Sequence, residues 1–216
     1  FEDAESCLDF LINNKVDINE IKQLKNYEYF LANLSSIINE IFEEQKEYIC
    51  CANGCCGCCS QGMYPYSELE FKYLKLGFDN LPEETKAQVI KNAKETSKEY
   101  KGKHFMYRCP FLINGSCSVY LYRGLICRTF GLITENSEGK LTIPYCAGEG
   151  LNYSKVYNPN TERISEEDVK KLGYKVMPKA YNLSRQHIET LSLAKKLELN
   201  WGESLMLLEW ILPYIE

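Results

Sequence analysis

The sequence lacks several features, and each lack excludes a class of protein. No apolar run approaches the roughly 20 residues of a membrane-spanning helix, and runs such as Leu205–Leu208 are far shorter. The formal net charge is −5, which disfavours nucleic acid, since a surface that binds nucleic acid is basic. No nucleotide-binding loop, catalytic triad pattern or internal repeat is present. We therefore expect neither a membrane nor a nucleic-acid partner.

Cysteine is almost absent outside one region. Residues 147–216 contain none, and residues 1–49 contain only Cys7. Small disulfide scaffolds spread cysteines through a short chain, and 216 residues can bury a core without such staples. We expect reduced thiols in a cytoplasmic protein. No signal peptide is visible, although residues before Phe1 could have been removed.

The region between residues 50 and 146 holds ten of the eleven cysteines, and residues 50–59 alone hold six. Such density indicates metal, an iron–sulfur cluster or disulfides rather than packing. The three adjacent pairs in residues 50–59 could not each close on themselves without strain, which favours metal. The isolated Cys7 is interpreted as a small buried apolar residue.

The cysteines fall into a local set and a dispersed set. Thiolates bind zinc and iron well, and closely spaced pairs can hold one ion from a single loop. Eight thiolates suit two mononuclear sites or one polynuclear cluster, whereas the roles of Cys50 and Cys56 stay open. The predicted metal ligands are Cys51, Cys55, Cys58 and Cys59 in the local set, and Cys109, Cys117, Cys127 and Cys146 in the dispersed set.

The expected fold class is mainly α with a small β-hairpin-containing, cysteine-rich metal-binding insert, which makes the protein α+β. We expect a single domain over 1–216, with the cysteine-cluster metal-binding region at 50–146 and helical flanks at 17–48 and 165–212. The predicted helices cover 17–48, 67–78, 82–101, 165–172, 182–198 and 202–212. The predicted hairpins pair 110–113 with 117–120 and 130–134 with 140–144.

Short motifs support these boundaries. Asp17 and Ser67 each precede a Glu by three residues, as in a capping box, and Asn200 is a candidate N-cap for the last helix. Asn114-Gly115 suits a two-residue type I′ turn. That turn would pair Leu112 with Cys117. Cys109 and Cys117 then point to opposite faces and serve different sites, unless Pro110 ends the pairing.

The cysteine pattern resembles a known family. Cys51-x3-Cys55-x2-Cys58-Cys59, Cys109-Pro110-Phe111-Leu112, Gly115-x-Cys117-x-Val119-Tyr120 and Arg123-x3-Cys127-Arg128-x-Phe130 look like the cysteine-cluster family of zinc- or iron-chelating domain proteins (YkgJ-like). The resemblance covers about residues 50–146 and implies the eight ligands given above. It differs at Gly124, where the family usually has Pro, and in the extra Cys50 and Cys56.

Two other resemblances bear on the chemistry. A distant relative of that family, the flagellin lysine N-methylase, carries a similar cluster and is linked to an iron–sulfur centre and S-adenosylmethionine. The spacing Cys51-x3-Cys55-x2-Cys58 also looks like the cluster loop of radical S-adenosylmethionine enzymes. Against that interpretation, Gly57 occupies the position of the expected aromatic residue, and helices rather than strand–helix units follow.

Arginine is scarce and clusters beside the cysteines. Three of the five arginines, Arg108, Arg123 and Arg128, flank Cys109 or Cys127. A four-thiolate site is anionic, and burying that charge is costly unless it is paired. We therefore expect Arg123 and Arg128 to contact a cofactor, and Arg128 to hydrogen-bond to sulfur or a nearby carbonyl. His104 is interpreted as a hydrogen-bonded surface residue rather than a ligand or proton relay, and His187 as a structural residue of a helix.

Three functions remain open on the sequence. The first is a metal-dependent redox or methyl-transfer enzyme that binds an iron–sulfur cluster (4Fe-4S), iron or zinc. The second is a structural zinc module that binds a protein or peptide partner. The third is a thiolate-rich protein for metal storage or trafficking. A structural zinc site is closed by four ligands, whereas an enzyme site keeps an open position.

Overall fold

The computed structural model describes residues 17–52, 54–136, 138–161 and 163–215. Cys7 lies outside the described residues. The structure is mostly helical, with 49% helix and 11% strand, and the strands of the described residues form two-stranded antiparallel sheets. Among the described residues, no helix is long and apolar enough to cross a membrane. The mostly helical fold with small hairpins agrees with the sequence-based expectation.

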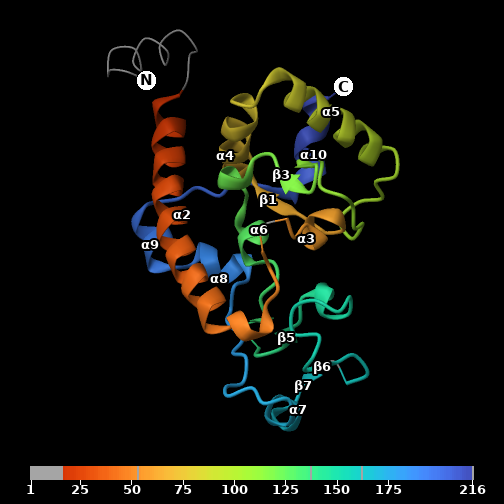
Figure 1. Ribbon diagram of the computed structural model, residues 1–216. Helices are drawn as coiled ribbons and strands as arrows, with labels where there is room; N and C mark the ends of the chain where they lie inside the picture. Colours follow the sequence, from red (N-terminus) through yellow and green to blue (C-terminus); the bar gives the residue numbers. More distant parts are fainter. Residues whose placement is uncertain (1–16, 53, 137, 162, 216) are drawn as a thin grey trace.

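The longest helix is α2 (Ile18–Glu44), which extends along one side of the molecule (Figure 1). Its N-cap is Asp17, whose carboxylate accepts a hydrogen bond from the Asn19 backbone N–H. The helix ends earlier than predicted, and a 3₁₀ turn, η1 (Lys46–Tyr48), follows it. At this point Gln45 is buried, and its side chain bonds to the carbonyl of Lys179 and the hydroxyl of Tyr153. These tertiary bonds replace continued helix.

The helix α4 (Glu68–Asp79) begins with the predicted capping box, in which Ser67 and Glu70 bond reciprocally. Glu70 does more than cap the helix. Its fully buried carboxylate also accepts a hydrogen bond from the Leu125 backbone N–H at 2.8 Å and pairs with Arg185. A buried carboxylate needs such partners because desolvation of its charge is costly. Glu70 thereby joins three segments that are distant in sequence.

The last predicted helix is wrong over its first half. Residues Ser204–Met206 form strand β8, which pairs antiparallel with β1 (Pro65–Ser67). The helix α10 (Leu207–Ile211) starts only after this strand, with Met206 rather than Asn200 at its N-cap. Long-range strand pairing overrides the local helical pattern, because β1 supplies backbone partners that no pattern within 200–212 reveals.

The first hairpin matches the prediction in turn and register. Strands β2 (Leu112–Ile113) and β3 (Ser116–Cys117) pair Leu112 with Cys117. Asn114 and Gly115 both have positive φ, as a type I′ turn requires. The last pairing bond joins Ser118 N–H to the Phe111 carbonyl, so Cys109 lies outside the hairpin. Pro110 therefore ends the pairing, which is the second of the two predicted alternatives.

Other boundaries also differ from the predictions. The helix predicted at 182–198 is two short helices, because Leu191 between them is extended. The second hairpin starts at Thr134 rather than 130, because residues 125–129 form a helix. The remaining elements are α3 (Gly57–Ser60), α5 (Glu83–Ser97), η2 (Tyr120–Tyr122), α6 (Leu125–Thr129), β4 (Thr134–Glu135), β5 (Leu141–Thr142), η3 (Tyr145–Ala147), β6 (Tyr157–Asn158), β7 (Arg163–Ile164), α7 (Glu166–Lys171), α8 (Arg185–Glu189), α9 (Ser192–Lys196) and η4 (Leu212–Tyr214).

The buried side chains form separate clusters. One joins α4, α5 and α10 around residues such as Leu74 and Leu208. Another packs α2 against α4 and residues 188–201, with Tyr27 and Phe30 against Trp201. A third surrounds Tyr153 near β4–β7, which Figure 1 places far from α5 and α10. The candidate site draws its walls from the first two clusters.

Candidate metal centre

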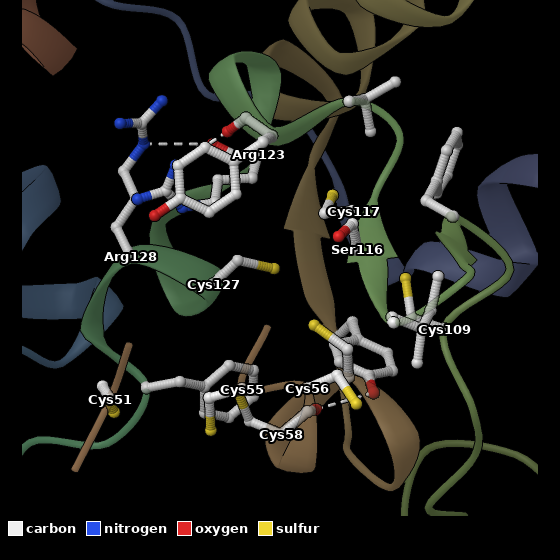
Figure 2. Close-up of a pocket in the computed structure, with 18 of the residues that line it drawn as sticks. Cys51, Cys55, Cys56, Cys58, Cys109, Ser116, Cys117, Arg123, Cys127 and Arg128 are labelled. Atoms are coloured by element: carbon white, nitrogen blue, oxygen red, sulfur yellow. Dashed lines mark hydrogen bonds between the residues drawn. The ribbon is translucent and has the colours of Figure 1, made fainter. Parts of the chain in front are cut away.

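A cavity of about 700 Å³ gathers most of the cysteines. In Figure 2, Cys51, Cys55, Cys56 and Cys58 lie along the bottom of the view, with Cys127 and Cys117 above them and Cys109 to one side. None of the ten cysteines in the described residues forms a disulfide. Residues more than 70 positions apart in the chain thus share one space. The thiol-bearing lining residues are Cys51, Cys55, Cys56, Cys58, Cys59, Cys109, Cys117 and Cys127.

Backbone pairing brings the local set against the dispersed set. Gly62 and Tyr107 exchange two backbone hydrogen bonds, at 3.1 and 3.0 Å. Two residues beyond Tyr107, the Cys109 N–H donates to the Cys59 carbonyl at 2.8 Å. The buried Tyr64 hydroxyl reinforces this pairing by bonding to the carbonyls of Cys58 and Tyr107. The positions of Cys59 and Cys109 are therefore set by the fold.

The buried side chain of Asn152 holds the start of residues 50–59, which we call the cysteine loop. Its oxygen accepts from the Cys50 N–H at 2.8 Å, and its nitrogen donates to Cys51 Sγ at 3.0 Å and to the Gly131 carbonyl at 2.8 Å. Gly131 has a φ of +91°, and a Cβ there would lie 2.8 Å from Cys51 Sγ. Such a close approach is open only to glycine.

Cys127 lies on α6, where Tyr66 positions it. The buried Tyr66 hydroxyl is 3.4 Å from Cys127 Sγ and accepts a bond from the Gly124 N–H at 2.9 Å. Because its oxygen already accepts from Gly124, its proton is best placed to donate to the sulfur. A Cβ at Gly124 would lie 2.7 Å from the Tyr66 ring. This contact, with the required N–H, explains why glycine rather than proline follows Arg123.

Cys146, the eighth predicted ligand, does not line the cavity. It is buried in η3, beside Tyr145, whose hydroxyl donates to the Gly57 carbonyl of the cysteine loop. Burial, together with the neighbouring thiols of Cys51, Cys58 and Cys55, raises the pKa of Cys146 to about 11. It therefore adjoins Cys51, Cys55 and Cys58 without lining the cavity.

Burial and mutual proximity raise the pKa of the Cys109 and Cys127 thiols. The pKa of Cys127 rises to about 12, mainly through burial, while the Tyr66 hydrogen bond opposes the rise. Burial raises the pKa of Cys109, and Cys127, Cys117 and Cys58 add to the effect. Thiolates repel one another in a confined space, and a bound cation reverses that balance by pairing with them. Metal binding here would displace protons.

Two groups of thiols follow from these neighbours. Cys51, Cys55 and Cys146 lie together, and Cys109, Cys117 and Cys127 form the other group with Cys59 near Tyr64. Cys58 interacts with both groups. The donor set consists of soft sulfur ligands suited to zinc or iron. In the part of the chain that the structure describes, no three Cys, His, Asp or Glu side chains are arranged to hold one ion, so the side chains would have to turn toward a bound metal.

The arginines separate into two kinds. Arg123 and Arg128 line the cavity, whereas Arg108 is exposed, as are His104 and His187. The Arg128 guanidinium donates to the carbonyls of Arg123 and Leu121. The predicted bond to a nearby carbonyl is thus confirmed, and the alternative bond to sulfur is not formed in the described structure. Burial, followed by the neighbouring Arg123, lowers the pKa of Arg128.

Sequence reasoning missed three residues that position the thiols, namely Asn152, Gly131 and Tyr66. Nothing local marks Asn152, because its partners are about 20 and 100 residues away. Gly131 follows Phe130 directly after the cysteine–arginine motif, and a glycine next to a predicted ligand could have been interpreted as a close approach. Nothing in the sequence around Tyr66 connects it with Cys127, which lies 61 positions away.

No family model, curated protein or solved structure matches this chain in the comparisons made with each.

Proposed function

We propose that the chain binds a transition metal through the thiolates of its shared cavity, as an iron–sulfur cluster (4Fe-4S) or iron, with zinc as the alternative. The observation that carries this proposal is that eight thiols from separate elements line one cavity while remaining free. Packing alone does not account for this, because free cysteines normally occur singly in cores. The resemblance to zinc- or iron-chelating proteins supports the same interpretation.

The eight cysteines form two donor groups for the metal. Cys51, Cys55, Cys58 and Cys146 form the donor group of the loop side. Cys59, Cys109, Cys117 and Cys127 form the donor group of the wall side. Asn152 and Tyr66 donate hydrogen bonds to one sulfur of each group, and such bonds tune a metal–sulfur centre. Two four-thiolate sites or one polynuclear cluster both fit these donors.

The cavity favours an enzyme over a purely structural module. A structural zinc site is closed by its four ligands, whereas this cavity is also lined by Arg123, Arg128 and polar residues of α2 such as Ser35 and Asn39. Its volume of about 700 Å³ lies in the range of ligand-binding pockets. We infer that the metal serves a redox or methyl-transfer reaction on a molecule that enters this space.

Elemental analysis and a visible spectrum of anaerobically purified protein test the proposal. We expect at least one tightly held metal ion per chain, and absorbance typical of iron–sulfur centres if the cluster assignment holds. A colourless preparation loaded with zinc would select the zinc alternative. Only traces of zinc and iron, with every thiol free or oxidised to disulfide, would refute metal binding.

A further inference from the structure

The thiol cavity contains a second chemical feature, which is a pair of arginines that make no ion pair within the described residues. Arg123 and Arg128 both line the cavity. Among the described residues, the ion pairs of arginine involve Arg185 and neither of these two. In Figure 2 the two arginines lie together at the upper left, across Cys127 from the cysteines at the bottom of the view. Two positive charges therefore face a space whose described lining residues include no carboxylate.

The protein orients both guanidinium groups through uncharged partners. Arg128 donates from Nε to the Arg123 carbonyl at 3.1 Å, from Nη1 to Ser35 Oγ at 3.0 Å, and from Nη2 to the Leu121 carbonyl at 2.9 Å. Arg123 donates to the Tyr120 carbonyl at 2.7 Å and lies over the Tyr120 ring at 3.7 Å. A guanidinium has five N–H donors, so both groups keep donors free within the described structure.

The wall beside these arginines is suited to an organic molecule. Ile38 and Phe42 of α2 line the same cavity, and Ser35 joins this wall to Arg128. Ligand pockets typically combine apolar walls with a few convergent polar groups. Arginine is the residue that matches carboxylate and phosphate geometry with two parallel hydrogen bonds.

We propose that Arg123 and Arg128 form the anion-binding subsite of the cavity, which holds the carboxylate or phosphate end of a small molecule whose apolar part packs against Ile38 and Phe42. This deepens the proposed function, and rests on it in that the bound molecule would be the substrate beside the thiolate-held metal. Arg128 makes no bond to sulfur in the described structure, which separates this role from direct charge compensation of the thiolates.

Titration calorimetry on the anaerobically purified protein tests the subsite with three probes, namely inorganic phosphate, phenyl phosphate and phenylacetate. Phenyl phosphate and phenylacetate distinguish the two anion types, and inorganic phosphate against phenyl phosphate measures the apolar wall. We expect binding of at least one phenyl probe, weakened about tenfold or more in Arg123→Gln through the loss of a charge-assisted bond. Arg163→Gln, at an exposed arginine of β7, should bind as the wild type does.

Arg123→Gln should fold normally, because the only hydrogen bond that its side chain makes within the described residues reaches a carbonyl three positions away. Arg128→Lys is the second variant, which keeps the charge and removes the planar fork, and should also weaken binding. No binding of any probe to the wild type, or equal affinities for the wild type and Arg123→Gln, would overturn the subsite.

Metal content measured on the same samples separates this inference from the proposed function. Metal present without probe binding rejects the subsite and leaves the metal assignment standing. Probe binding that depends on Arg123 in a metal-free protein supports the subsite and rejects the metal assignment. Loss of metal in Arg123→Gln, with no probe bound by the wild type, would assign the arginines to the charge of the thiolates and reject the subsite.

Discussion

Thiols of the loop-side and wall-side groups reach the same cavity by different means. Cys51 and Cys55 lie on an exposed loop, and the main side-chain tether near its start is Asn152. Cys109 is buried, and Cys117 and Cys127 are half-buried on a hairpin and a helix that pack into the core. Tertiary structure thus positions these three thiols. Cys51 and Cys55 are close in sequence and exposed, and we expect a metal to order them.

The largest expected effect distinguishes the thiols that bind metal from those that do not. Cys109→Ser or Cys127→Ser should lose most of the bound metal and destabilise residues 105–150, because metal–thiolate bonds can contribute roughly 10–16 kcal/mol in small domains. Metal analysis and hydrogen exchange of residues 105–150 measure both effects. Cys50→Ser and Cys7→Ser are the controls. Equal metal content and equal melting temperatures in all four variants would contradict the ligand assignment.

The next effect concerns Glu70, which holds the start of α6, the helix that carries Cys127 of the wall-side group. Glu70→Gln should lower the free energy of unfolding by about 3–5 kcal/mol, because Arg185 loses its fully buried carboxylate partner and keeps only the more distant Glu189. It also disturbs the start of α6, where Glu70 accepts from the Leu125 N–H. Glu189→Gln is the matched control, since Glu189 lies 3.5 Å from the same guanidinium but is partly exposed. Denaturant unfolding that shows equal losses for the two variants would reject the central role of Glu70.

A smaller effect on metal retention should appear in the loop-side group. Asn152→Ala removes the partners of the Cys50 N–H and the Gly131 carbonyl, which we expect to cost about 2–3 kcal/mol. Metal held by the loop group should become easier to remove with a chelator, while the wall group keeps its thiols protected from alkylation. Asn158→Ala, at an exposed turn of β6, should change neither property. Equal alkylation of the loop-side and wall-side thiols in Asn152→Ala would show that the two groups do not bind metal independently.

The smallest effect concerns a single sulfur. Tyr66→Phe removes the hydroxyl that bridges the Gly124 N–H and Cys127 Sγ, and should cost about 1–2 kcal/mol of stability. If a redox centre is present, its reduction potential should shift, because hydrogen bonds to sulfur tune such centres. Tyr29→Phe on the exposed face of α2 provides the comparison. An unchanged potential and unchanged stability in Tyr66→Phe would remove this tyrosine from the site.

The sequence predicted the local features well. The capping box at Ser67, the Asn114-Gly115 turn and the register of Leu112 with Cys117 all follow from contacts within a few residues, and all are present. The α6 helix and the pairing of β1 with β8 were missed, because their stabilising partners are far away in the chain. Glu70, for example, shows only its capping role in sequence, while its bond to Leu125 spans 55 positions.

The candidate site was predictable to a similar extent. Cysteine spacing identified seven residues that line one cavity, and also Cys146, which neighbours three of them without lining it. The extra lining thiol of Cys56 had been left open. What spacing could not show is which side chains hold the sulfurs, since Asn152, Gly131 and Tyr66 act through contacts made only by the folded chain.

X-ray absorption at the iron and zinc edges of anaerobically purified protein tests the central claim most directly, because it reports the atoms bound to the metal. We predict a first coordination shell of sulfur, at about 2.3 Å as is typical of zinc–thiolate bonds, that is lost in Cys109→Ser or Cys127→Ser and kept in Cys50→Ser. A shell of nitrogen and oxygen alone, or one unchanged by those substitutions, would contradict it.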